Sequence, residues 1–123
     1  MSKIGIGNNV RITVARGRRG ALARMFTEAL GCPVIQPPGA KDMEVFLFEG
    51  GGIGAYYVDD EDALTPEQAR GGAWLEFLVA DPEATRVALA AQGIEPFEYH
   101  DREHLYFAAP GGQVFRLGAL APE

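Results

Sequence analysis

Residues 74–82 read WLEFLVADP, and they combine a strand with the start of a helix. Residues 74–79 are apolar apart from Glu76, and a short run of this kind is typical of a buried strand. Asp81 suits a helix N-cap and Pro82 suits the first helical position. The stretch therefore predicts a strand that leads directly into a helix, and Gly93 supplies that helix's C-terminal stop.

The same order of elements occurs about sixty residues earlier in the chain. Residues 10–15 alternate as a strand, residues 21–30 have helical spacing, and Gly31 ends the helix. The spacing between matching positions is nearly constant: 63 residues from Arg11 to Trp74, 62 from Gly31 to Gly93, and 60 from Gly51-Gly52 to Gly111-Gly112. Two copies of a βαβββ unit account for this repetition and predict an α+β fold, with a dimeric ferredoxin-like barrel as the alternative.

The remaining elements complete each unit. Strands are predicted at residues 44–48 and 53–58 in the first unit and at 105–108 and 114–117 in the second, with one more short strand near 97–99. Thr65 and Pro66, with a glutamine at position 68, predict a short connecting helix between the units.

Composition limits the class of protein. The chain has 123 residues, so we expect one domain over residues 1–123, with internal modules at about 8–60 and 72–120. Its net charge of −6 argues against nucleic-acid binding, which depends on clustered positive charge. Cys32 is the single cysteine, and no apolar run approaches the ~20 residues that cross a bilayer. We therefore expect a cytoplasmic protein with no membrane partner.

Three motifs resemble those of the glyoxalase/bleomycin-resistance/dioxygenase proteins, also called the vicinal-oxygen-chelate superfamily. Residues 25–31, MFTEALG, resemble the sequence that closes the first helix in that family. Residues 77–82, FLVADP, which lead to AQGI at 91–94, resemble its second strand and helix. Residues 110–117, PGGQVFRL, resemble its closing hairpin. The motifs occur in the family's order on a duplicated chain, and the resemblance covers residues 10–117.

The resemblance implies two tandem βαβββ modules whose curved mixed or antiparallel sheet surrounds a cavity, with the helices outside. It also implies metal ligands in the first and last strand of each unit. At those positions this sequence has Arg11, Tyr56, Trp74 and Arg116. A divalent metal prefers imidazole, carboxylate or thiolate, whereas arginine stays protonated and tryptophan only donates. We therefore expect no metal at the family site and no other cofactor.

Strand alternation also predicts which side chains line the cavity. If the apolar residues of each strand face a helix, the alternate side chains face the cavity, and these include Arg11, Tyr56, Trp74, Glu76 and Arg116. Two arginines and one carboxylate leave one positive charge over, and arginine's planar fork suits an anion. Aromatic walls with few polar anchors are the usual form of a small-molecule site. The alternative is that the arginines pair with Glu76 and loop acids, or lie at the solvent mouth.

Residues 100–104, HDREH, match the H-x-x-E-H pattern of inverted zinc metalloproteases. The segment runs directly into the predicted strand at 105–108, where residues four apart are separated by ~13 Å, too far to share a metal. A solvated turn, or a histidine at the cavity rim that acts as an acid or base, explains the segment better.

These observations predict a metal-free binder of a small organic molecule, analogous to the bleomycin-resistance branch of the superfamily, and an anionic ligand would match the surplus guanidinium. One alternative is an enzyme: a lyase or isomerase with Glu76 or His104 as base, or a metal-dependent dioxygenase-type enzyme if the alignment differs. Another is a non-catalytic interaction module. The resemblance also implies a homodimer, sometimes with units exchanged between chains, and either arrangement can complete the cavities.

Overall fold

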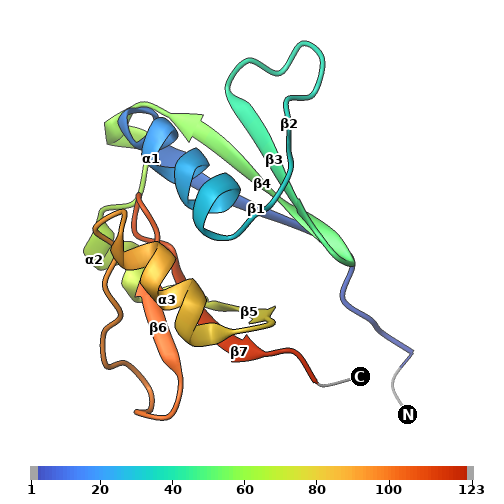
Figure 1. Cartoon of the computed structure of the whole chain (residues 1–123). Coiled ribbons are helices and arrows are strands. Elements are labelled where there is room, and N and C mark those ends of the chain that lie inside the picture. The colour runs from blue at the N-terminus through green and yellow to red at the C-terminus, as the bar shows by residue number, and fades with distance from the viewer. Residues whose placement is uncertain (1–2, 122–123) are drawn as a thin grey trace.

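The computed structural model describes residues 3–121, whose strands form two sheets (Figure 1). The first sheet has the order β1-β4-β3-β2, with strands β1 (Asn9–Ala15), β2 (Val34–Ile35), β3 (Met43–Phe48) and β4 (Gly51–Val58). The second sheet has the order β5-β7-β6, with strands β5 (Leu75–Val79), β6 (Leu105–Ala108) and β7 (Val114–Ala119). Residues 1–2 and 122–123 of the expected domain lie outside the described residues. The predicted α+β class is confirmed.

Both sheets are mixed, and both pair their strands in the same way. The first strand of each sheet lies parallel to the last strand, β1 to β4 and β5 to β7. The last strand also pairs antiparallel with the strand before it, through a tight hairpin. This arrangement follows from the chain path, because a helix carries the chain back over the sheet before the hairpin begins.

The described residues form several helical segments, of which α2 and α3 begin at the capping residues that the sequence predicts. They are η1 (Arg16–Arg18), α1 (Arg19–Arg24), η2 (Met25–Ala29), η3 (Asp60–Asp62), α2 (Pro66–Arg70) and α3 (Pro82–Ala90). Thr65 and Gln68 form a reciprocal capping box at α2. The Asp81 carboxylate accepts a hydrogen bond of 3.1 Å from the backbone of Ala84 in α3. Within residues 3–121, none of the helices has the length and apolar character to span a bilayer.

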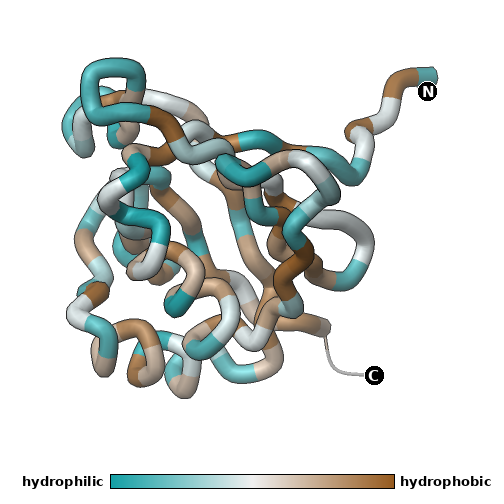
Figure 2. The backbone as a smooth tube through the Cα atoms, turned by 90° about the horizontal axis from the view of Figure 1, so that it is seen from above, coloured by the Kyte–Doolittle hydropathy of each residue, from teal (hydrophilic) through white to brown (hydrophobic). Residues whose placement is uncertain are grey.

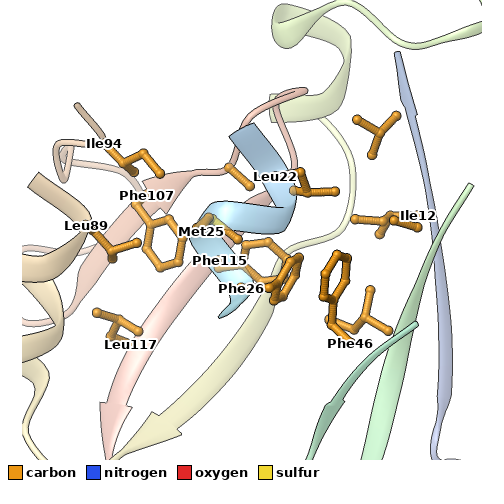
Figure 3. Close-up of a cluster of buried hydrophobic side chains, with 14 of the residues drawn as sticks. Ile12, Leu22, Met25, Phe26, Phe46, Leu89, Ile94, Phe107, Phe115 and Leu117 are labelled. Carbon is orange, nitrogen blue, oxygen red and sulfur yellow. The ribbon is translucent and has the colours of Figure 1, made fainter. Parts of the chain in front are cut away.

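The main hydrophobic core lies between the two sheets, around Phe26 from η2 (Figure 3). The Phe26 ring is fully buried and stacks on Phe46 of β3, with ring centroids 4.4 Å apart. It also meets Phe77 and Phe115 of the second sheet edge-on, each at 6.1 Å. Since both sheets pack their inner faces on one core, their opposite faces point away from each other. We call these the outer face of the first sheet and the outer face of the second sheet.

Three local features differ from the sequence expectations. The first helix starts earlier than residue 21 and widens into a π-type turn, in which the Leu30 amide donates to the Met25 carbonyl. The expected strand at 97–99 is a single bridge between Phe97 and Tyr106, because the chain turns away directly afterwards. The short β2 was not expected among the nearby prolines. The described N-terminal residues lead away from the body (Figure 2), and Ile6 is fully exposed.

Candidate functional site

The side chains predicted to line a cavity all point away from the hydrophobic core. In β1, Ile12 and Val14 are buried while Arg11 is exposed. In β5, Glu76 and Leu78 are exposed between residues that pack inward. The period-two prediction of side-chain orientation is therefore correct for both sheets, because the pleat of a strand imposes this alternation on neighbouring residues.

Arg11 lies on the outer face of the first sheet, against an aromatic ring. Its guanidinium carbon is 4.1 Å from the centroid of the Tyr56 ring on the neighbouring strand β4. No carboxylate oxygen among residues 3–121 lies within 4.0 Å of its nitrogen atoms. A cation–π contact at an exposed position contributes only about 0.5–1 kcal/mol and leaves the N–H donors at the guanidinium edge available. Arg11 is thus a positioned cation without an anionic partner in the described part of the chain.

Arg116 lies on the outer face of the second sheet, and its charge is already balanced. Its Nε donates to Glu76 Oε2 at 2.6 Å, because β5 and β7 pair with these two residues opposite each other. One of its terminal nitrogens is 3.9 Å from Asp101 Oδ2, and its guanidinium lies 4.8 Å from the Trp74 ring. Hydrogen bonding to Tyr106 and to Glu76 raises the pKa of Arg116. The alternative prediction, in which an arginine pairs with Glu76, therefore describes Arg116.

Each sheet has an arginine–aromatic pair at an equivalent place. In the first sheet the arginine comes from the first strand and the ring from the last strand, whereas in the second sheet the ring comes from the residue just before the first strand and the arginine from the last strand. Arg11 lies on the first strand of its sheet, two residues before the residue that pairs with Tyr56. Trp74 immediately precedes the first strand of the second sheet, two residues before the residue that pairs with Arg116. Each outer face thus carries one guanidinium over one ring at the places where relatives are expected to hold a metal.

Asp101 is the principal residue that the sequence prediction missed. Its carboxylate accepts hydrogen bonds from the backbone of Glu103 and His104, at 3.0 and 2.9 Å, and from the Tyr106 hydroxyl at 3.0 Å. The His104 Nδ1 lies 3.1 Å from both carboxylate oxygens. Desolvation alone would raise the pKa of Asp101, but these hydrogen bonds outweigh it and lower the pKa to about 2. Because its pKa is about 2, Asp101 is ionised at neutral pH, and its carboxylate orients the His104 ring.

The histidines of the HDREH segment have separate environments. His100 packs on the Tyr99 ring, with centroids 4.1 Å apart, and also lies near Trp74. His104 is held by Asp101 instead. The segment is a turn and not a helix, so it lacks the geometry that an inverted zinc site requires.

The structure divides the five predicted ligand-binding residues between two surfaces. Arg11 and Tyr56 meet on the outer face of the first sheet, whereas Trp74, Glu76 and Arg116 meet on the outer face of the second. A site that contains all five would need a second copy of the chain, which is one of the two arrangements that the sequence left open. The cause of the division is the shared core, which brings the helix-bearing faces of the sheets together and separates the other two.

The residues at the family's metal positions do not suit a metal. Arg11 and Arg116 are cations held against rings, and the Glu76 carboxylate is already bound to Arg116. Among residues 3–121, no three His, Cys, Asp or Glu side chains converge as a metal site would require. A guanidinium cannot lose its proton to become a ligand, so we derive no chemistry through a metal.

The fold defines the class of protein to which this chain is similar. No protein-family model matches the sequence, and no curated protein matches it significantly. The structure nevertheless matches solved structures over nearly its whole length, and it has the glyoxalase-like fold of the vicinal-oxygen-chelate superfamily.

Three of these solved structures illustrate the match. A candidate glyoxalase family protein from Bacillus anthracis has a TM-score of 0.71 at 18% identity, over 95% of this chain and 96% of that chain. The fosfomycin resistance protein FosX from Listeria monocytogenes has a TM-score of 0.66 at 17% identity, over 99% of this chain and 95% of that chain. An integron cassette protein from the mobile metagenome of V. cholerae has a TM-score of 0.71 at 15% identity, over 98% and 99%. The predicted superfamily fold is confirmed.

Proposed function

We propose that this protein binds a small organic anion on the outer face of its first sheet, with Arg11 as the anchor. The observation that carries the proposal is the Arg11 guanidinium, held over Tyr56 with no carboxylate within ion-pair distance in the described residues. A ring-supported guanidinium loses little freedom when it binds, and its edge can donate two parallel hydrogen bonds to a carboxylate.

We further propose that a second copy of the chain completes the site. The outer face of the first sheet carries the unbalanced Arg11, whereas that of the second carries two carboxylates, Glu76 and Asp101, against one guanidinium. Faces of opposite net charge favour pairing of the first sheet of one chain with the second sheet of its partner. β1 and β5 are both edge strands, so each has a backbone edge available for such pairing. Trp74 and Arg116 would then face the ligand from the partner subunit.

In this proposal the protein binds its ligand without catalysing a reaction, and it holds no metal. Two positioned guanidiniums would repel a divalent cation, and Glu76 already serves Arg116. We propose a role like that of the bleomycin-resistance proteins, in which a ligand is sequestered without chemistry, in the cytoplasm, by one domain over residues 1–123. Elemental analysis of the purified protein tests the metal-free state: one tightly held zinc, iron or manganese ion per chain would refute it.

A thermal-shift screen of small organic acids, followed by calorimetric titration, tests anion binding. Arg11→Ala removes the anchoring hydrogen bonds, which contribute about 1.5–3 kcal/mol when one partner is charged. We expect affinity for carboxylates to fall at least about tenfold, since 1.4 kcal/mol corresponds to that factor. Arg102→Ala is the matched control, because Arg102 is exposed and, within residues 3–121, its ion-pair partner is Glu98. If no acid binds, or if Arg11→Ala and Arg102→Ala bind acids equally well, the proposal fails.

The Asp101–His104 pair favours a second candidate function, an enzyme that moves a proton. A carboxylate that orients an imidazole is the usual arrangement of a general base. His104 is partly exposed and lies in the same hydrogen-bonded cluster as Arg116. Its reaction class would be proton abstraction from carbon next to a carbonyl group, as in an isomerase or lyase.

Deuterium exchange tests this candidate. Phenylpyruvate in D₂O exchanges the protons next to its keto group slowly in buffer, and NMR follows the loss of that signal. The enzyme candidate predicts faster exchange with the protein, lost in His104→Gln and retained in His100→Gln. Exchange at the buffer rate, or equal rates in the two variants, would exclude His104 as the base.

A further inference from the structure

The outer face of the first sheet contains a trough, which we call the glycine trough. Its floor is the central strand β4, where the two successive outward positions are Gly52 and Gly54 and carry no side chain. The hollow over them has a volume of about 210 Å³. Since neither residue has a side chain of its own, the floor is covered only by side chains that lean over it from β3, and Gly54 is buried beneath the Met43 methyl group.

The two walls of the trough differ in chemistry. The strand register places Arg11 beside Gly54, and Gly54 beside Val45 of β3 on the other side. The wall from β1 therefore consists of polar side chains, whereas the wall from β3 consists of apolar ones. The polar wall contains Asn9, Arg11 and Thr13, and the apolar wall contains Met43, Val45 and Leu47.

One end of the trough is closed by the arginine–tyrosine pair. Tyr56 is the next outward residue of β4 after Gly54, and the Arg11 guanidinium lies over its ring. A ligand that lies along β4 over the glycines thus meets apolar side chains along its body and a guanidinium at its Tyr56 end. The trough is suited to a molecule with one charged end and one apolar end.

The spacing of the strands limits the thickness of the ligand. β1 and β3 flank β4, so their backbones are about 9.6 Å apart, twice the spacing of neighbouring strands. One layer of ligand atoms in contact with both walls needs about 7–8 Å, and a second layer would need about 11 Å. A flat molecule standing between the walls fits this width once the Met43 methyl group has moved off the floor. The volume of the hollow corresponds to about seven waters at about 30 Å³ each, which suits a single ring with one substituent.

Met43 makes the apolar wall adjustable. A side-chain carbon built on Gly54 would lie 2.8 Å from the Met43 methyl group, so this thioether reaches over the floor of the trough. Methionine is flexible and makes favourable contacts with aromatic rings. An entering ring would displace the Met43 methyl group from the floor and then pack against it.

We infer that the ligand of the glycine trough is a planar aromatic monocarboxylate, with its ring between Arg11 and Met43 over Gly54 and its carboxylate on Arg11. This inference rests on the proposed anion binding and names its ligand class. The ring fills the single-layer slot, and the carboxylate lies in the plane of the ring, as the guanidinium at the end of the slot requires.

Three probes of similar size test the ligand class by calorimetric titration. They are benzoate, which is flat and charged, cyclohexanecarboxylate, which is charged but thick, and benzyl alcohol, which has a flat ring but no charge. We expect benzoate to bind at least tenfold more tightly than either of the others. Equal binding of the two acids, both dependent on Arg11, would overturn the inference and leave the proposed anion binding intact. Failure of both acids to bind would overturn both.

A glycine variant tests the location. Gly54→Ala places a methyl group on the floor, where it meets only the movable end of Met43 closely, and we expect benzoate affinity to fall at least tenfold. Gly17→Ala is the matched control, since its added carbon has no neighbour within 4 Å. Unchanged benzoate affinity in Gly54→Ala would place the ligand elsewhere.

A measurement on the unmodified protein covers the case in which Gly54→Ala does not fold. In NMR spectra with benzoate, the Met43 methyl signal should shift and show a nuclear Overhauser effect to the ring protons. A Met43 methyl signal that does not respond at saturating benzoate would refute the placement.

Discussion

Mixing two inactive variants should restore ligand binding if the site is shared between subunits. In an Arg11→Ala dimer every site lacks its anchor, and in a Trp74→Ala dimer every site lacks the ring from the partner subunit. Within a mixed dimer, the unaltered first sheet of the Trp74→Ala chain faces the unaltered second sheet of the Arg11→Ala chain. One site of the mixed dimer is then intact, and the other carries both substitutions.

The size of the restored signal follows from this geometry. Random reassociation of equal amounts produces about half mixed dimers in a symmetric homodimer, and one of the two sites in each is intact. About a quarter of all sites should therefore bind benzoate with the unaltered affinity. Arg11→Ala alone should show no such sites, because loss of a charge-assisted hydrogen bond costs about 1.5–3 kcal/mol. Trp74→Ala alone should show none either, because every site then lacks the ring from the partner subunit.

Titration calorimetry after dissociation and reassociation measures the fraction of tight sites, and light scattering confirms the dimer. The control is a mixture of Arg11→Ala with Tyr56→Ala, whose substitutions lie on the same sheet face. That mixture should restore nothing, since every site retains one damaged first sheet. A monomer in solution, or a mixture of Arg11→Ala and Trp74→Ala with no tight sites, would refute the shared site.

Three further predictions concern the stability of the fold. Phe26→Ala should lower the free energy of unfolding by about 3–5 kcal/mol in urea titrations, because Phe26 fills the core between the sheets, whereas the half-exposed Phe48→Ala should cost clearly less. Equal losses would contradict the packing around Phe26. Asp81→Ala should cost about 0.5–2 kcal/mol through loss of the α3 cap, and Asp81→Asn, which keeps a capping oxygen, should cost less. For Asp101, the folded state lowers the pKa from 3.8 to about 2, so its stabilising effect is present above pH ~4 and is lost as the pH falls through ~2. Asp101→Asn should thus flatten the dependence of stability on pH between pH 4 and 2, and an unchanged acid profile would show that the carboxylate is not held as described.

The sequence was informative wherever a local rule decides the structure. The capping residues Thr65 and Asp81 begin helices as predicted, since a cap depends only on the next three residues. Arg11 and Glu76 point away from the core as predicted, since the pleat of a strand alternates its side chains. The repeat of about sixty residues correctly indicated two similar sheets, because each copy contains its own turns and periodicity.

Such local rules predicted less of the candidate site than of the fold. Asp101 was missed because its partners include Tyr106 on the strand that follows the turn, and only the folded turn brings the two together. From the sequence, Gly51 and Gly52 are interpretable only as matching positions of the repeat. The place of Gly52 and Gly54 between β1 and β3, where they form the floor of the trough, appears only when the strand order is known.

The amino-acid sequence by itself determined the class of fold, the duplication, the face toward which Arg11 and Glu76 point, and the presence of arginine where a metal ligand was expected. Only the tertiary structure decided that the two outer faces lie on either side of a shared core, and that Arg11 has no carboxylate partner among residues 3–121 whereas Arg116 pairs with Glu76. The physical reason is that alternation and capping are local, whereas the placement of one sheet against the other depends on burying Phe26 between residues from distant parts of the chain.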